Sequence, residues 1–116
     1  MMNQSMIEQQ KASRSVVVTN PQGLHARPAD MFVKLASQFN AKVEVIKDDA
    51  CERIDGKSIL EVLTLAALEG TRLVLEATGP DAEEAIDALV KLVENDFPGY
   101  EDVDPDQTDE NIRNPK

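Results

Sequence analysis

Residues 58–78 read SILEVLTLAALEGTRLVLEAT, and the spacing of their apolar residues changes at Gly70. Before this glycine, apolar residues recur every three or four positions, which predicts a helix over 58–69. Ser58 and Glu61 have the spacing of a capping box at its start, and Gly70 is a typical helix stop. After the glycine, apolar and polar residues alternate over 71–78, which predicts a strand with one solvated face.

The same two patterns alternate along the rest of the chain. Upstream, the sequence predicts a strand over 15–19, a helix from His25 or Ala26 to about Asn40, and strands over 42–47 and 51–54. Downstream, Gly79-Pro80-Asp81 opens a last helix with Pro80 at its first position. The order β-α-β-β-α-β-α predicts an α+β fold, an open-faced β-sandwich in which three helices cover one face of a four-stranded antiparallel sheet.

The composition excludes several classes of protein. The 116 residues include 22 acidic and 12 basic ones, a net charge of −10, which disfavours nucleic acid and anionic membrane as partners. A single Cys (Cys51) and a single His (His25) form neither an intramolecular disulfide nor a Cys/His zinc cluster, so no metal or cofactor is expected. No apolar run approaches the roughly 20 residues of a membrane span, and the first residues lack the apolar core of a signal peptide. We expect a cytoplasmic monomer.

The two ends of the chain differ from its middle. Residues 94–116 contain eight acidic and two basic residues, three prolines lie from residue 98 onward, and the first dozen residues are polar. Such segments bury too little apolar surface to offset chain entropy. The sequence therefore predicts a flexible extension over 1–13, one folded domain over 14–96 and an acidic, flexible tail over 97–116.

One short segment, Gly23-Leu24-His25-Ala26-Arg27-Pro28, combines residues suited to phosphoryl chemistry. Backbone N–H groups at a helix start attract anions, phosphate in particular. Arg27 adds a guanidinium that pairs with phosphate oxygens, and His25 offers a nucleophilic ring nitrogen. The residue types alone also fit a surface or packing role for His25.

The segment GLHARPA, residues 23–29, resembles the active-site signature of HPr, the histidine-containing phosphocarrier family of the phosphoenolpyruvate-dependent sugar phosphotransferase system. The similarity extends over about residues 14–96. It implies that phospho-enzyme I phosphorylates Nδ1 of His25, that Arg27 stabilises the phosphoryl oxygens, and that IIA domains of sugar permeases then receive the group. The implied docking surface contains Leu24, Ile59, Leu60 and Leu63. The protein would then be a substrate of other enzymes and not an enzyme itself.

The resemblance also implies a regulatory site at Ser58, where HPr proteins under regulatory control are phosphorylated by HPr kinase/phosphorylase. A helix cap is the structural alternative for this serine. Two positions depart from the family pattern. Gln22 replaces a smaller polar residue, and Glu61 replaces a glycine and adds a negative charge to the docking face.

Three functional hypotheses remain open from the sequence. The first is a phosphocarrier for sugar uptake. The second keeps the chemistry of His25 but has a regulatory output, as in nitrogen-linked or kinase-controlled HPr-like proteins. The third is a protein-interaction module in which His25 is inert.

Overall fold

The structure, a computed structural model, describes residues 10–48 and 52–98, and its helices and strands follow the predicted order. The elements are β1 (Lys11–Val17), α2 (Ala26–Ala36), β2 (Lys42–Lys47), β3 (Glu52–Asp55), α3 (Ile59–Leu65), β4 (Arg72–Thr78) and α4 (Ala82–Glu94). Cys51, which the sequence places at the start of a strand, lies outside the described residues.

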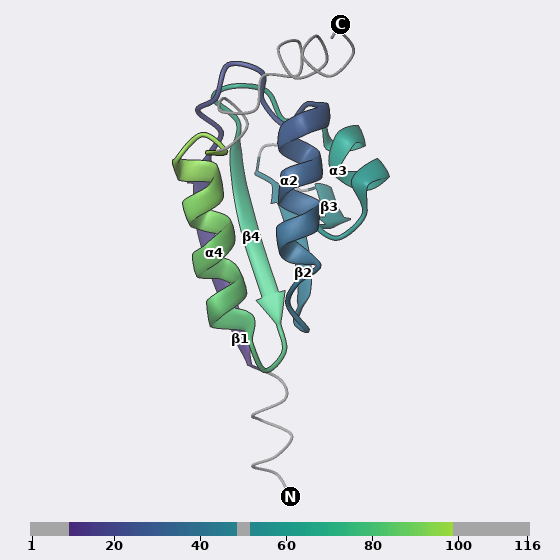
Figure 1. The fold of residues 1–116 in the computed structure, drawn as a ribbon, viewed down its shortest axis with the longest axis vertical. Helices are drawn as coiled ribbons and strands as arrows, with labels where there is room; N and C mark the ends of the chain where they lie inside the picture. The colour runs from purple at the N-terminus through teal and green to yellow at the C-terminus, as the bar shows by residue number, and fades with distance from the viewer. Residues whose placement is uncertain (1–9, 49–51, 99–116) are drawn as a thin grey trace, which may run out of the picture.

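The four strands form one antiparallel sheet with the order β1-β4-β2-β3. In its central row, Val45 of β2 lies between Ile54 of β3 and Leu75 of β4. Figure 1 shows α2 and α4 side by side over one face of this sheet, with α3 next to α2. The predicted α+β open-faced sandwich is therefore confirmed.

The core lies between the helices and the covered face of the sheet. Alternate residues of the strands point into it, because successive side chains of a strand face opposite sides. The helices contribute apolar stripes whose largest members include Phe32 of α2, Leu65 of α3 and Leu89 of α4, all almost fully buried. Packing of these stripes fixes where α2 begins, and so fixes the position of His25.

The uncovered face of the sheet carries a charged triad. Glu44 and Glu76 lie directly opposite each other on β2 and β4, a pairing of like charges that is unfavourable on its own. Nη1 of Arg53 on β3 donates to both carboxylates, at 2.7 and 2.8 Å. The hydrogen bond to Glu76 is the main reason that the pKa of Arg53 is raised. Arg53 thus offsets the repulsion between Glu44 and Glu76 that results from the pairing of β2 with β4.

The folded domain extends beyond both predicted boundaries. β1 begins at Lys11, inside the extension predicted for 1–13, because Lys11, Ala12 and Ser13 pair with the end of β4. At the other end, Phe97 belongs to the predicted tail, yet its side chain is fully buried and its N–H donates to the carbonyl of Leu92 at 2.8 Å. Residues 1–9 and 99–116 lie outside the described residues, so the predictions made for them stay predictions.

Two helix ends differ from the sequence-based expectation. α2 ends at Ala36 and not near Asn40, because i→i+3 hydrogen bonds from Gln38 and Phe39 tighten the chain into turns. α4 begins at Ala82, with Asp81 at the N-cap position, so Pro80 precedes the helix.

Asp81 joins the loop before α4 to the loop before β2. Its carboxylate accepts hydrogen bonds from the backbone N–H groups of Asn40 at 2.8 Å and Ala41 at 2.7 Å. The hydrogen bond from Asn40 is the main cause that lowers the pKa of Asp81 below its ordinary value of 3.8. The two loops are also in close contact, since a Cβ added at Gly79 would lie 2.8 Å from the Cα of Ala41.

We expect Asp81→Asn to destabilise the protein at neutral pH, because the neutral amide accepts these two hydrogen bonds less strongly than the carboxylate does. A pKa lowered in the folded state stabilises the protein above the unfolded-state pKa, and this contribution is lost as the pH falls through the folded-state pKa. The difference in free energy of unfolding between wild type and Asp81→Asn should therefore be constant near pH 7 and shrink below about pH 4. Urea unfolding over this pH range measures it, and a pH-independent difference would contradict the assignment.

Candidate functional site

His25 stands at the junction between the loop over residues 20–25 and α2. Its backbone is extended, with φ −84° and ψ −167°, and its carbonyl accepts the N–H of Ala29 at 2.8 Å, so it is the N-cap residue of α2. The imidazole makes no capping hydrogen bond, and the residue is exposed. His25 therefore lies at the surface, where an incoming group can reach it.

The loop that carries His25 is held at both ends by hydrogen bonds. The side-chain amide of Asn20, a buried residue, donates to the carbonyl of Gly23 at 2.8 Å, and the N–H of Gly23 returns to the carbonyl of Asn20 at 3.0 Å. The N–H of Leu24 donates to the carbonyl of Ala67 at 2.8 Å. The segment after α3 thus supports the residue immediately before His25.

Gly23 is required at its position for two reasons. Its φ is +67°, and a Cβ there would lie 2.4 Å from the carbonyl oxygen of Ala67. Gly70 offers a matched comparison, because its φ is +92° but nothing lies within 4 Å of an added Cβ.

We expect Gly23→Ala to lower the free energy of unfolding by roughly 2–3 kcal/mol, because the backbone strain adds to a clash with backbone that cannot rotate away. Gly70→Ala should cost only about 1–2 kcal/mol, since it has the strain alone. Urea unfolding of both variants measures the difference. Equal losses would show that the contact with Ala67 does not constrain the loop.

The first turn of α2 is arranged to receive an anion. Within the described part of the chain, no acceptor binds the backbone N–H groups of Ala26 and Arg27, and no acidic residue occupies this turn. Pro28, the third helical residue, has no N–H to satisfy. The guanidinium of Arg27, a half-buried residue, makes no ion pair with any described residue. Two amides and one cation without a partner among the described residues therefore follow His25 directly in the chain, at the start of α2.

A hollow of about 320 Å³ lies directly beside His25. It is lined by Gln22, Leu24, His25, Leu63, Ala66, Ala67 and Leu68. Most of these side chains are apolar, so the hollow can accept an apolar side chain of a protein partner. The site thus combines a nucleophile, an anion-binding turn and an apolar contact surface.

The predicted docking residues divide into exposed and buried ones. Leu60 is 72% exposed and Leu63 is 37% exposed, so both offer surface, whereas Ile59 is half-buried. Leu24 is only 3% exposed, although it lines the hollow beside His25, so its part in docking stays a prediction. Its side chain packs into the core, which anchors the loop and leaves its neighbour His25 outside.

Leu68 is a surface residue that the sequence reasoning missed. It is 68% exposed, and its N–H donates to Oγ1 of Thr71 at 3.1 Å in a tight turn. The turn arises because α3 ends at Leu65, four residues before the predicted end, and Ala66 adopts a left-handed conformation with φ 55°. The sequence contains one signal for this exposure. Leu68 is apolar but lies outside the apolar stripe of the helix predicted over 58–69.

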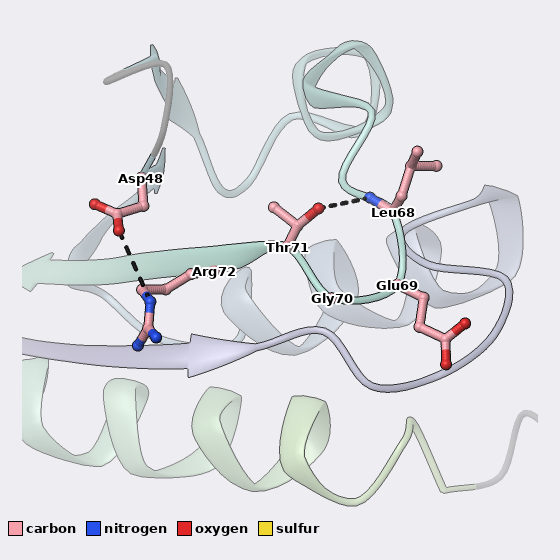
Figure 2. A pocket seen from close by; sticks show the side chains of 6 residues that line it. All are labelled: Asp48, Leu68, Glu69, Gly70, Thr71 and Arg72. Atoms are coloured by element: carbon pink, nitrogen blue, oxygen red, sulfur yellow. Dashed lines mark hydrogen bonds and ion pairs between the residues drawn. The ribbon is translucent and has the colours of Figure 1, made fainter.

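A second hollow, of about 410 Å³, shares the lining residue Leu68 with the first. Figure 2 shows the residues that line it, Asp48, Leu68, Glu69, Gly70, Thr71 and Arg72, with Nε of Arg72 3.8 Å from Oδ2 of Asp48. It is larger than the hollow beside His25 but contains no nucleophilic ring nitrogen or thiol. The candidate site is therefore the smaller hollow.

Ser58 is a helix cap. Its Oγ accepts the N–H of Glu61 at 3.3 Å at the start of α3. The predicted capping box is only half formed, because the Glu61 carboxylate accepts the N–H of Asp55 at 2.8 Å, while the N–H of Ser58 donates to the carbonyl of Asp55 at 3.1 Å. Glu61 thus joins α3 to the end of β3.

Across residues 10–48 and 52–98, no group of three His, Cys, Asp or Glu side chains is placed to hold a metal ion. Within the same residues, no helix has the length and apolar character needed to cross a membrane.

Comparison with known proteins agrees with this site. The family model described as the PTS HPr component phosphorylation site matches residues 12–95. The phosphocarrier protein HPr of Neisseria meningitidis serogroup A is 43% identical over 84 residues, which are 72% of this chain and 92% of that protein. A multiphosphoryl transfer protein of Haemophilus influenzae is 38% identical over 80 residues, 68% of this chain and 16% of its own length.

Among solved structures, HPr-C-His from Thermoanaerobacter tengcongensis superposes with a TM-score of 0.70 at 41% identity, covering 74% of this chain and 94% of that one. The match includes the helix start and the loop that present His25. The chain therefore belongs to the HPr family of phosphocarrier proteins and is not an enzyme.

Proposed function

We propose that His25 accepts a phosphoryl group from phospho-enzyme I of the phosphotransferase system and passes it to IIA domains of sugar permeases. The observation that supports this most directly is the exposed His25 at the N-cap of α2, followed in the chain by two helix N–H groups and the Arg27 guanidinium, which have no partner among the described residues. The relatives named as phosphocarriers favour this role over an interaction module in which His25 is inert. The proposal keeps the expectation that the protein acts in the cytoplasm, together with both transfer partners.

The chemistry of acceptance is one exchange of phosphorus–nitrogen bonds. Neutral Nδ1 of His25 attacks phosphorus, a new P–N bond forms, and the donor's P–N bond breaks with its electron pair returning to the donor nitrogen. The transferred group carries its charge on its oxygens throughout. Arg27 and the free N–H groups of Ala26 and Arg27 stabilise this charge, and donation to the next protein is the same exchange in reverse.

The partner surfaces dock on the apolar residues around the hollow. Leu60, Leu63 and Leu68 are the exposed leucines of this region. The backbone of Leu68 is held in a hydrogen-bonded turn with Thr71, so little loop entropy is lost when a partner covers it. Gln22 lines the same hollow, where its amide can contact the partner or the phosphoryl group.

Phosphorylation of Ser58 by HPr kinase/phosphorylase stays a prediction. Its hydroxyl serves as the cap of α3, which accounts for the residue structurally. A phosphate there would stand beside the carboxylates of Asp55 and Glu61, while the ammonium of Lys57 is engaged by the carbonyl of Phe39 at 2.7 Å. Acid-stable phosphate that is lost in Ser58→Ala would support the modification.

The test of the proposed function is transfer from phosphoenolpyruvate. The full chain is incubated with enzyme I and labelled phosphoenolpyruvate, and the label is mapped by mass spectrometry. We expect acid-labile phosphate in the peptide that contains His25, and subsequent loss of this label when a IIA domain is added. Absence of label with several enzymes I would contradict the proposal.

A further inference from the structure

The buried side chain of Asn20 has only one of its two polar atoms paired. Asn20 is 3% exposed, and within residues 10–48 and 52–98 it is the one polar residue that is buried. Its Nδ2 donates to the carbonyl of Gly23 at 2.8 Å, and Nδ2 must face this group because a carbonyl only accepts hydrogen bonds. Its Oδ1 is buried and accepts a hydrogen bond from no described group. A buried acceptor without a donor costs free energy, so folding alone does not account for an amide at this position.

The amide of Asn20 closes the turn that precedes His25. The N–H of Gly23 donates to the backbone carbonyl of Asn20 at 3.0 Å, so residues 20–23 form a β-turn with Pro21 at its second position. The side-chain amide adds a second hydrogen bond between the same two residues, to the carbonyl of Gly23. Gly23 is therefore held through both of its backbone polar groups.

The second of these hydrogen bonds fixes one edge of the peptide group that joins Gly23 to Leu24. The carbonyl of this peptide accepts from Asn20, and its N–H donates to the carbonyl of Ala67 at 2.8 Å. Because a peptide group is planar, contacts at these two opposite edges set its orientation. His25 follows Leu24 directly, so the orientation of this peptide determines where the chain enters α2.

The segment before the turn has attachments that do not need the amide. The N–H of Val18 donates to the carbonyl of Thr71 at 2.9 Å. The hydroxyl of Thr19 donates to the carboxylate of Asp96. Loss of the Asn20 amide should therefore loosen the chain only after the turn, on the side that leads into α2.

We propose that Asn20 is a positioning residue for the phosphorylation of His25. The inference rests on the proposed function of His25. In phosphoryl transfer the attacking and leaving atoms lie roughly in line through phosphorus, so the rate depends strongly on where the nucleophile is held. Asn20 acts on this geometry at a distance, through the peptide between Gly23 and Leu24.

The test compares Asn20→Ala with a control at the neighbouring residue. Asn20→Ala deletes the unpaired Oδ1 but leaves the carbonyl of Gly23 without its donor, so one unpaired buried acceptor replaces another. We therefore expect a urea midpoint close to that of wild type. Thr19→Val is the matched control, because it also removes one side-chain hydrogen bond but leaves the turn intact.

The kinetic readout is single-turnover transfer from phosphorylated enzyme I, measured at increasing concentrations of that enzyme. We expect Asn20→Ala to lower the maximal rate by about tenfold to a hundredfold, the effect of displacing a reacting group by about 1 Å. The half-saturating concentration should stay within about twofold of wild type, since the exposed leucines of the docking surface are unchanged. Thr19→Val should leave both quantities within about twofold of wild type.

A second readout needs no partner protein. Hydrogen exchange of the Leu24 amide, followed by NMR, reports how often its hydrogen bond to Ala67 opens. The Val18 amide, which is bonded to Thr71, is the internal reference. In Asn20→Ala we expect Leu24 to exchange about tenfold faster relative to Val18, as the loss of one hydrogen bond would produce. Thr19→Val should leave this ratio unchanged.

An unchanged exchange ratio for Leu24 would overturn the inference, and so would a maximal rate of Asn20→Ala equal to that of Thr19→Val. If Asn20→Ala failed to fold, or had a urea midpoint far below that of Thr19→Val, the amide would serve folding and the inference would again be wrong. A wild-type chain that takes no phosphate from enzyme I would instead refute the proposed function. The exchange ratio would then still show whether Asn20 holds the peptide before Leu24.

Discussion

His25→Ala is expected to abolish the incorporation of acid-labile phosphate from phosphoenolpyruvate and enzyme I, while the protein stays folded. His25 is the single histidine of the chain, so no second imidazole can replace it. Its side chain is exposed and makes no capping hydrogen bond, so its removal should change the free energy of unfolding by no more than about 0.5 kcal/mol. Loss of phosphate with an unchanged urea midpoint would therefore report on chemistry and not on stability.

Variants of Arg27 should slow the phosphorylation of His25 without abolishing it. Removal of a group that stabilises charge in the transition state typically costs about 10²–10³ in rate, so Arg27→Ala should slow phosphorylation of His25 by about that factor. Arg27→Lys should retain part of the rate, because it keeps the charge but loses the two-pronged contact with phosphate oxygens. The measurement is single-turnover transfer from phosphorylated enzyme I.

Lys34 is a matched control on the same helix. It lies two turns beyond Arg27, and its ammonium is 3.2 Å from a carboxylate oxygen of Asp30. Lys34→Ala removes the same charge from α2 without touching the site, and its transfer rate should stay within about twofold of wild type. Equal losses in Arg27→Ala and Lys34→Ala would mean that Arg27 acts only through overall charge.

The helix start that carries the candidate site was predictable from the sequence because its position depends almost entirely on local residues. His25, Arg27 and Pro28 occupy one helix start, and the chemistry of a helix start depends on a few consecutive residues. The sheet was predictable for a similar reason, since alternation within β2 and β4 marks which side chains face the core. Both conclusions need only short stretches of chain.

The sequence-based predictions differ from the structure where residues distant in the sequence are in contact. α3 stops at Leu65 because the carbonyl of Ala67 is used by Leu24, and Lys47 donates to the carbonyl of Leu65 at 3.3 Å. Helical periodicity in residues 58–69 gives no indication of either contact. Leu24 is a comparable case, because only the packed structure shows that an apolar residue lining the hollow is also buried in the core.

The burial of Phe97 is the largest difference between the sequence-based prediction and the structure. Replacement of Phe97 also has the largest expected effect on stability. Phe97→Ala should lower the free energy of unfolding by about 3–5 kcal/mol, because a fully buried ring is removed and leaves a cavity. The backbone conformation, with φ 56°, is equally strained for phenylalanine and alanine, so the variant isolates the loss of the ring. Urea unfolding measures the loss, and Phe97→Leu should show a smaller one.

Phe39→Ala is the matched control for Phe97→Ala. The sequence assigns Phe39 to the apolar stripe of a helix and Phe97 to a flexible tail, yet Phe39 is only half-buried and lies beyond the end of α2. Burial therefore predicts that Phe97→Ala costs more than Phe39→Ala, the reverse of the order that the sequence pattern implies. If Phe97→Ala were the milder of the two, Phe97 would not be part of the core.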